Sequence, residues 1–428
     1  MSDVSALTPA LPASPRLPAS RGAAFEARLK QRYAAERRFR RFGFAAIAFS
    51  ALVLGFLLLT MTNNAVGGFQ RAELAFPLDL AKAQLTVDPS QLAGPQAIKA
   101  LETAGLPDAV RLAAARSAGE PAAAELSDTA WREVAKQIVA SPSLLRAQLA
   151  VSLPVSKDLA AGARGDNTPE MRALAAKLTR EGKLHRAFDS GFLTRSDATD
   201  PQSVGIWGAL KGSMLTMFVT LALAFPIGVL SAVYLEEYAP RNRWSELIEV
   251  SINNLAAVPS IIFGLLGLAV FLGVFPNWRS APLIGGMTLA LMTMPVIVIS
   301  GRNAIKAVPP SIRDAALAIG ASRVQMVFHH VLPLALPGIL TGTIIGMARA
   351  LGETAPLLMI GMRAFVATPP GGLTSPSTVL PVQIFLWSDE IDRGFVERTS
   401  AAIIVLLLFL LAMNGLAIYL RNRFEKHW

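Results

Sequence analysis

The sequence contains no cysteine and few charged residues for its length. None of the 428 residues is a cysteine, so disulfides and thiolate metal sites are excluded. Charged residues make up 16% of the chain, whereas hydrophobic residues make up 53%. This balance lies outside the usual range of soluble proteins, and it indicates that a lipid bilayer is the solvent for much of the chain.

Several signatures of catalysis and ligand binding are also absent. No Gly-x-x-x-x-Gly-Lys-Ser/Thr phosphate loop occurs, so we expect any ATP to bind to another subunit. No recognisable Ser/His/Asp arrangement is present, so no catalytic residue is predicted. The adjacent pair His329-His330 predicts no metal site, because neighbouring helical side chains point about 100° apart. No basic run is interleaved with aromatic residues, which argues against a nucleic-acid partner.

Six apolar segments are each long enough to cross a bilayer once. The first, residues 42–62, starts too far from Met1 and runs too long for a cleaved signal peptide, so we expect a retained transmembrane helix 1. The other five belong to a membrane domain at residues 204–420. Their apolar cores lie near residues 213–235, 255–275, 283–301, 334–361 and 399–420. The sequence therefore predicts an all-α membrane protein with six transmembrane helices.

Residues 63–203 differ in composition from the rest of the chain. They are charged, rich in alanine and interrupted by proline and glycine. Ser141-Pro142 and Thr168-Pro169 each place a hydroxyl residue directly before a proline, which is typical of a helix N-terminus. We expect a mainly helical external domain between transmembrane helices 1 and 2.

The net charge of +10 is concentrated beside the apolar segments. Residues 1–41 hold nine Lys and Arg against three acidic residues, and their first twenty residues are expected to be disordered. With this segment in the cytoplasm, the cytoplasmic loops hold eighteen Lys and Arg and the short external segments five, as the positive-inside rule requires. The 63–203 domain would then face the periplasm, 421–428 would be a cytoplasmic tail, and Glu236-Glu237 would lie in a solvated cytoplasmic turn.

The cytoplasmic loop between the fourth and fifth spans is predicted to contain two short helices. Ser311 and Asp314 have the spacing of a capping box, which predicts a helix start at Ser311. Gly320 is expected to end this helix, because glycine adopts the left-handed conformation common there. The helix presents one apolar face. That face consists of Ile312, Ala315, Ala316 and Ile319.

The second helix of this loop would start at the cap residue Ser322 and run toward His330. Pro333 and Pro337 are expected to separate it from the next span. An amphipathic helix pair between two spans can dock into the groove of a partner, or it can lie on the surface with no partner. The physical features of the loop leave both alternatives open.

The fifth apolar segment contains an arginine and a glutamate four residues apart. Gly338, Gly342 and Gly346 precede them as a stripe of small residues, which is most simply a packing face. Counted from Gly338 at about 1.5 Å per residue, Arg349 would lie near mid-membrane, where a charge is costly. Arg349 and Glu353 can neutralise each other in a structural pair, or Arg349 can offer its planar fork to an oxyanion or hold a gate. The sequence does not separate these uses.

The cytoplasmic loop resembles the coupling loop of ABC importer permeases, which reads Glu-Ala-Ala, three residues, Gly, nine residues, then Ile-x-Leu-Pro. Asp314-Ala315-Ala316, Gly320 and Leu332-Pro333 fall in register, while Asp314 stands for Glu and His330 for Ile. The resemblance implies a type I ABC importer permease whose loop is moved by a dimeric ATPase that binds ATP and Mg²⁺. The ATPase-coupling residues are then Ser311, Asp314, Ala315, Ala316, Gly320, Leu332 and Pro333.

The block from Ala348-Arg349 to Gly352-Glu353-Thr354-Ala355-Pro356-Leu357-Leu358 is similar to the signature of the A-type permease of the bacterial phosphate-specific ABC importer. Two further blocks, 254–264 and 380–385, also resemble that family. The resemblance implies that Arg349 matters for translocation, whereas the assignment of Glu353 to the pathway is our own inference. It also implies a multi-pass inner-membrane protein with both termini in the cytoplasm, bound to membrane lipid. Its partners would be a C-type permease, an ATPase dimer and a periplasmic phosphate-binding protein.

Two alternatives to a phosphate permease remain. A permease for another oxyanion, such as molybdate or sulfate, would share the coupling loop but should lack the Arg-x-x-Gly-Glu-Thr-Ala-Pro block. A membrane receptor would explain an external domain between two spans, but it would usually need a cytoplasmic signalling module, and only eight residues follow Leu420. The external domain at 63–203 departs from shorter relatives, and its role is not predicted.

Overall fold

The structure is a computed structural model that describes residues 19–424, apart from residues 84, 86, 88–91, 93, 95, 363 and 364. The chain divides into two compact units, residues 1–60 and 61–428. Residues 1–18 of the expected disordered tail and residues 425–428 of the expected C-terminal tail lie outside the described part.

Helix α1 (Ala19–Gly68) contains the predicted transmembrane helix 1 together with the basic segment before it. Its apolar stretch is long enough to cross a membrane, and none of the side chains in the most apolar window is buried. Exposed aromatic and aliphatic side chains of this density require lipid or another helix around them.

Four further helices are long and apolar enough to span a membrane. They are α8 (Trp207–Val233), α12 (Pro282–Lys306), α15 (Leu332–Gly352) and α18 (Arg393–Phe424). The segment predicted to span at 255–275 is not part of one straight helix. α9 (Arg243–Ala256) is bent by 104° from the helical segment Ser260–Val274, which begins with α10 (Ser260–Leu266). Pro259 lies at the bend in an extended conformation, and its missing N–H ends the first helix. The described residues thus hold five spans, or six if the bent pair is one.

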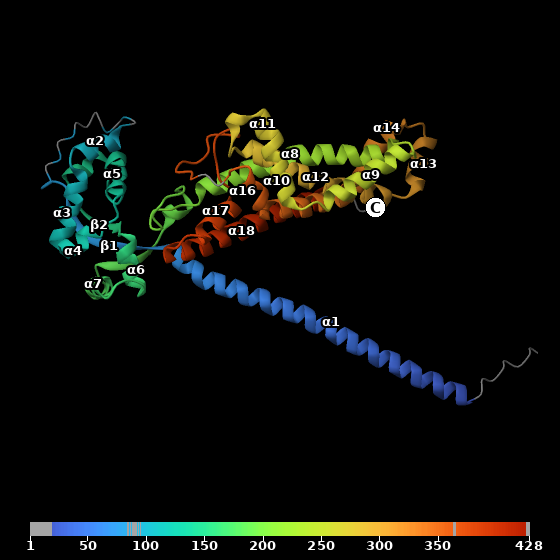
Figure 1. The fold of residues 1–428 in the computed structure, drawn as a ribbon, viewed down its shortest axis with the longest axis horizontal. Coiled ribbons are helices and arrows are strands. Elements are labelled where there is room, and N and C mark those ends of the chain that lie inside the picture. The colour runs from blue at the N-terminus through green and yellow to red at the C-terminus, as the bar shows by residue number, and fades with distance from the viewer. Residues whose placement is uncertain are drawn as a thin grey trace, which may run out of the picture. The chain divides into compact units, whose positions relative to one another are not determined.

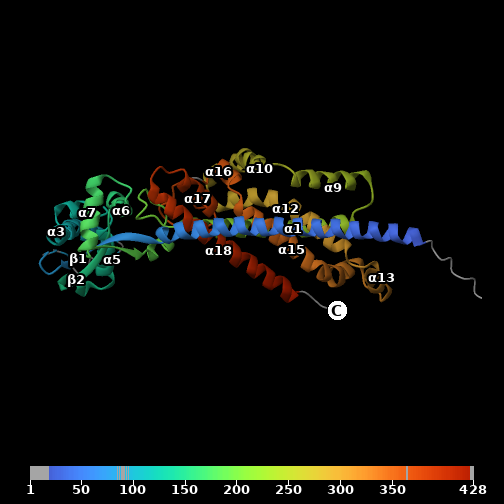
Figure 2. The ribbon, with the colours of Figure 1, turned by 90° about the horizontal axis from the view of Figure 1, so that it is seen from below.

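Helix α12 packs against both α8 and α15 (Figures 1 and 2). The glycine stripe of α15 makes this close approach possible, as predicted. A Cβ at Gly338 would lie 2.6 Å from the Cβ of Ala304, and a Cβ at Gly342 would overlap Ser300, both on α12. On α12 itself, a Cβ at Gly286 would lie 2.5 Å from Val219 of α8. Small residues therefore set the helix spacing in this bundle.

Short elements connect the long helices. After α10 come a π-turn (Gly267–Phe271), α11 (Leu272–Val274) and a 3₁₀ turn (Pro276–Trp278). The loop between α12 and α15 contains α13 (Pro310–Ala318), α14 (Arg323–Gln325) and a π-turn (Met326–Val331). Two short helices, α16 (Ala355–Met359) and α17 (Leu380–Ser388), precede α18. A π-turn at Tyr234–Tyr238 ends α8.

The external domain is mainly helical, as predicted, but it also contains a sheet that the sequence analysis missed. Its helices are α2 (Ala97–Thr103), α3 (Leu106–Ala118), α4 (Glu120–Ala124), α5 (Trp131–Ala140), α6 (Lys157–Arg164) and α7 (Pro169–Arg180), with 3₁₀ turns at Pro142–Arg146 and Ser190–Leu193. Thr168 caps α7 as predicted, since its hydroxyl accepts from the Met171 N–H. A buried cluster that includes Leu74, Leu101 and Ile138 forms a core of its own.

The sheet has three antiparallel strands in the order β2-β1-β3. They are β1 (Gln70–Asp79), β2 (Gln148–Pro154) and β3 (Leu184–Phe188). Pro77 in β1 argues against a central strand when the sequence is considered alone. The register resolves this, because β3 pairs only as far as Leu74, and Pro77 has a partner on one side only, Ala150 of β2.

Arg398 in the first turns of α18 ties the external domain to the membrane helices. Its guanidinium donates to Asp189 Oδ2 at 2.9 Å, to the Pro201 carbonyl at 2.8 Å and to the Gly68 carbonyl at 2.6 Å. Asp189 also accepts from Arg195 at 2.7 Å. The external domain is therefore held at the end of the bundle where α8 and α18 begin.

Candidate functional site

The loop helix α13 does not begin as predicted. It starts at Pro310, directly after Pro309, and no side chain caps it, so the capping box predicted for Ser311 and Asp314 is wrong. Pro310 at the first helical position has its backbone angle fixed for a helix and has no N–H to satisfy. The proline pair therefore sets the helix start without help from a hydroxyl.

The predicted apolar face of α13 divides into two parts. Ala316 is buried and Ile312 packs against the same cluster at the end of the bundle, so these two residues seat the helix on its own chain. Ile319 is 81% exposed, and Leu317 is exposed as well. An exposed isoleucine beside a leucine at the tip of a loop is available to a partner protein.

The end of α13 agrees with the prediction. Gly320 adopts a left-handed conformation with φ +88°, and the N–H of Ala321 donates to the carbonyl of Ala316 at 3.1 Å. Ser322 then caps the following helix in a complete capping box with Gln325. The loop thus has a rigid turn between its two helical pieces.

The second helical piece is not separated from the next span. Helical structure continues from Arg323 through the π-turn into α15, with Pro333 in the first turn of α15 and Pro337 inside it. Leu332 packs partly buried beside this turn. A π-turn changes the hydrogen-bond spacing of a helix, so the missing N–H of Pro333 falls where the pattern is already altered. A displacement at Ser322 is therefore carried directly into α15.

Arg313 links α13 to the end of α8. Its Nε and Nη2 donate to Glu237 Oε1 at 3.0 and 2.8 Å, while Nη1 and Nη2 donate to the carbonyls of Val308 and Ile305. The Glu237 side chain is only 8% exposed. The prediction of a solvated turn at Glu236-Glu237 is therefore wrong for Glu237. The fold buries this carboxylate against Arg313, which lies 76 residues away in the sequence.

Glu236 joins a second group of charges beside this link. Arg302 of α12 lies 3.4 Å from Glu236 and 2.9 Å from Glu249 of α9, and Lys306 lies 3.7 Å from Glu236. Helices α8, α9, α12 and α13 thus meet in one ionic network. The sequence places the acidic members at the end of α8 and in α9 and the basic members at the end of α12 and in α13, but it does not give their pairing.

Arg349 and Glu353 are brought together as the sequence predicted. Arg349 Nε lies 3.4 Å from Glu353 Oε1, and the arginine side chain is 47% exposed. The helix ends earlier than expected: Arg349 lies in the last turn of α15, and Glu353 follows the helix in an extended conformation. The carbonyls at a helix C-terminus favour a cation there, which reduces the cost of the arginine.

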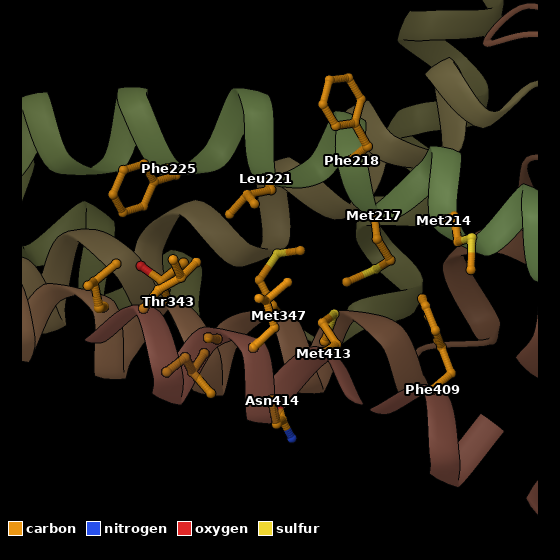
Figure 3. Close-up of a pocket in the computed structure, with 15 residues that line it drawn as sticks. Met214, Met217, Phe218, Leu221, Phe225, Thr343, Met347, Phe409, Met413 and Asn414 are labelled. Carbon is orange, nitrogen blue, oxygen red and sulfur yellow. The ribbon is translucent and has the colours of Figure 1, made fainter. Parts of the chain in front are cut away.

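An apolar groove of about 400 Å³ lies between α8, α15 and α18 (Figure 3). Met214, Met217 and Phe218 line it from α8, and Met347 and Met413 face them from α15 and α18. None of the described residues that line this groove is charged, so its lining matches apolar groups.

Two families match this chain in separate parts. Residues 209–426 match the family described as "Binding-protein-dependent transport system inner membrane component", and residues 26–173 match a domain of unknown function (DUF3333). The first match contains α13, the ionic network and Arg349. The second contains most of α1 and much of the external domain.

The named relatives align with about half of this chain. The chain is 31% identical to the "Probable ABC transporter permease protein YqgI" of Bacillus subtilis (strain 168), over 53% of this chain and 82% of that protein. It is 31% identical to the "Phosphate transport system permease protein PstA" of Yersinia pestis, over 50% of this chain and 71% of that protein. The PstA protein of Haemophilus influenzae is 30% identical over 53% and 79% of the two chains. A methionine ABC transporter structure, MetNI facing inward, aligns at 18% identity with a TM-score of 0.41 over 52% of this chain and 95% of that chain.

Proposed function

Since the chain belongs to the family of binding-protein-dependent transport system inner membrane components, we propose that it is the A-type permease subunit of an ATP-driven importer of inorganic phosphate. The observation that carries this proposal is the family match over 209–426 together with relatives named as phosphate permeases. The chain is a transport component of the inner membrane, and the phosphate specificity and the partners are the proposal.

The geometry of the loop supports coupling to a separate ATPase. Helix α13 presents Ile319 to solvent, is fixed to α8 through Arg313, and continues through Ser322 into α15. A force applied to α13 therefore reaches two membrane helices through rigid contacts. We propose that an ATPase dimer, which binds ATP and Mg²⁺, supplies this force, since no phosphate loop occurs in this sequence.

The remaining partners follow from the same proposal. A second, C-type permease would complete the pathway, and a periplasmic phosphate-binding protein would deliver the anion. Both termini would lie in the cytoplasm, on the same side of the membrane as α13. In this orientation the basic residues around α13 satisfy the positive-inside rule.

Arg349 is proposed to act on the translocated anion. Among the residues that the structure describes, the half-exposed Arg349 side chain has one weak polar contact, the 3.4 Å approach of Glu353, so its remaining donors are available to an oxyanion. Arg349→Gln removes the charge, and Arg349→Lys keeps the charge but removes the planar fork.

The test is uptake of radioactive phosphate by cells that lack the chain and carry the wild type, Arg349→Gln or Arg349→Lys. We expect the wild type to restore uptake, Arg349→Gln to abolish it, and Arg349→Lys to restore a minor part. Uptake of sulfate and molybdate is measured alongside. Restoration of sulfate or molybdate uptake without phosphate uptake would overturn the assignment of the substrate.

A further inference from the structure

A polar pocket of about 450 Å³ lies where the external domain meets the membrane domain. Arg71 of β1 and Arg132, Glu133 and Lys136 of α5 line one wall. The segment that leads from the external domain into α8 lines another wall with Arg195 and Asp197. Ala367 and Pro369, which follow α16, close a third side. We call this space the junction pocket.

The lining of the junction pocket is positively charged. Four cationic side chains, Arg71, Arg132, Lys136 and Arg195, line it together with two carboxylates, Glu133 and Asp197. Two further carboxylates outside the lining, Glu73 and Asp189, pair with Arg71 and Arg195, so the unpaired positive charge is that of Arg132 and Lys136. This distinguishes the junction pocket from the apolar groove of the bundle, which has no charged residue in its lining.

Two of the four cations already have partners that hold them in place. Arg71 donates to Glu133 Oε2 at 2.8 Å and to Glu73 Oε1 at 2.7 Å. Arg195 donates to Asp189 Oδ2, and the same oxygen accepts from Arg398. These charge-assisted pairs hold both arginines in the wall of the pocket, and the Arg71–Glu133 pair joins β1 to α5.

The other two cations have no such partner. Among the residues that the structure describes, no carboxylate lies within 4.0 Å of Arg132 or Lys136, and the Arg132 guanidinium rests over the Trp131 ring at 5.5 Å. They are four residues apart on α5, so they lie on the same face of that helix. The wall therefore carries two neighbouring, exposed cations that have no carboxylate partner among the described residues.

We propose that the junction pocket binds a small divalent oxyanion of the monohydrogen phosphate type, with Arg132 and Lys136 as its principal contacts. The two positive charges of these residues, which have no carboxylate partner among the described residues, match the charge of such an ion. The pocket is larger than one phosphate, so the bound ion keeps part of its hydration. This inference rests on the proposed function, and it gives the external domain the role of an accessory substrate site beside the permease.

The test is equilibrium binding of radioactive phosphate to the purified full-length chain in detergent at low ionic strength. The variant is Arg132→Gln with Lys136→Gln. The matched control is Arg172→Gln with Lys177→Gln, which removes the same charge from exposed positions of α7 outside the pocket. Charge-assisted hydrogen bonds predict an affinity at least about tenfold lower in the variant and unchanged in the control. All the substituted residues are exposed, so all three proteins should fold alike, as thermal unfolding checks.

No phosphate binding by the wild type, or equal binding by wild type and variant, would overturn the proposal. A second result would also overturn it. If Arg132→Gln with Lys136→Gln binds phosphate normally but no longer retains the periplasmic binding protein, the two cations bind an acidic side chain of that protein and not phosphate. Uptake by complemented cells separates this inference from the proposed function. Phosphate uptake that persists without pocket binding rejects only the junction pocket, whereas pocket binding without any uptake rejects only the importer assignment.

Discussion

Arg398 donates to Asp189 at 2.9 Å although both side chains are almost completely excluded from solvent, with 2% and 1% of their surfaces exposed. Arg398 belongs to α18 and Asp189 follows β3, so this pair joins the membrane helices to the external domain. Its guanidinium also donates to two backbone carbonyls, so each of its three nitrogens has a partner within the chain. A buried charge of this kind depends on its partner, since neither group can return to water.

Removal of either charge should therefore destabilise the protein strongly. Arg398→Met leaves Asp189 with one cation fewer, and a broken buried pair typically costs about 3–5 kcal/mol. We expect a clearly lower unfolding temperature for the purified chain in detergent. The control is Arg393→Gln, whose partner Asp166 is also acidic but whose own side chain is 74% exposed. Arg393→Gln should lower the unfolding temperature only slightly. An equal decrease in both variants would show that burial of the Arg398–Asp189 pair adds nothing to its contribution to stability.

The link between Arg313 and Glu237 should matter for coupling more than for assembly. Glu237→Gln weakens the contact that fixes α13 to α8, so we expect ATP hydrolysis to continue while phosphate uptake falls about tenfold, the usual effect of one charged hydrogen bond. Both rates are measured on the reconstituted importer. Arg323→Gln is the control, because it removes an exposed arginine of the same loop for which no carboxylate partner is present among the described residues. A normal uptake rate in Glu237→Gln would show that the link is not required.

Ile319 should bind the partner ATPase without contributing to the stability of the chain. Its side chain is 81% exposed, so Ile319→Asp should leave the unfolding temperature unchanged and prevent co-purification of the ATPase subunit. Ile391→Asp is the matched control, because Ile391 is exposed in the turn before α18 and far from α13 in the sequence. Retention of the ATPase by Ile319→Asp at the wild-type level would exclude α13 as the docking element.

The pKa of Asp197 predicts a dependence of stability on pH. Burial raises the pKa of this carboxyl above its ordinary value, and the nearby charge of Glu390 acts in the same direction. The folded state therefore binds the proton more tightly than the unfolded state. Below about pH 4 the carboxyl is protonated in both states and costs no stability, whereas the free energy of unfolding falls as pH rises through the folded pKa. Asp197→Asn keeps the oxygen that accepts from Trp387 Nε1 at 3.1 Å. This variant should raise the unfolding temperature at pH 7 and have less effect at pH 4. A larger effect at pH 4 than at pH 7 would contradict the upward shift of the Asp197 pKa.

The sequence predicted the features that depend on local chemistry. Apolar segments of sufficient length identified the membrane helices, the glycine stripe predicted the close packing of α15 on α12, and Thr168, Ser322 and Gly320 predicted helix ends that the structure contains. The i, i+4 spacing also brought Arg349 and Glu353 together. In each case, the determining interaction lies within a few residues along the chain or depends on hydrophobicity alone.

Tertiary structure decided the features that depend on distant partners. Glu237 and Arg313 are separated by 76 residues, Asp189 and Arg398 by 209, and no local pattern assigns such pairs. The sheet was missed for the same reason, because Pro77 is acceptable only where β3 has ceased to pair with β1. The charge, length and polarity of each segment are properties of its own residues, whereas the neutralisation of a buried charge and the pairing of a strand are properties of two segments that only the fold brings together.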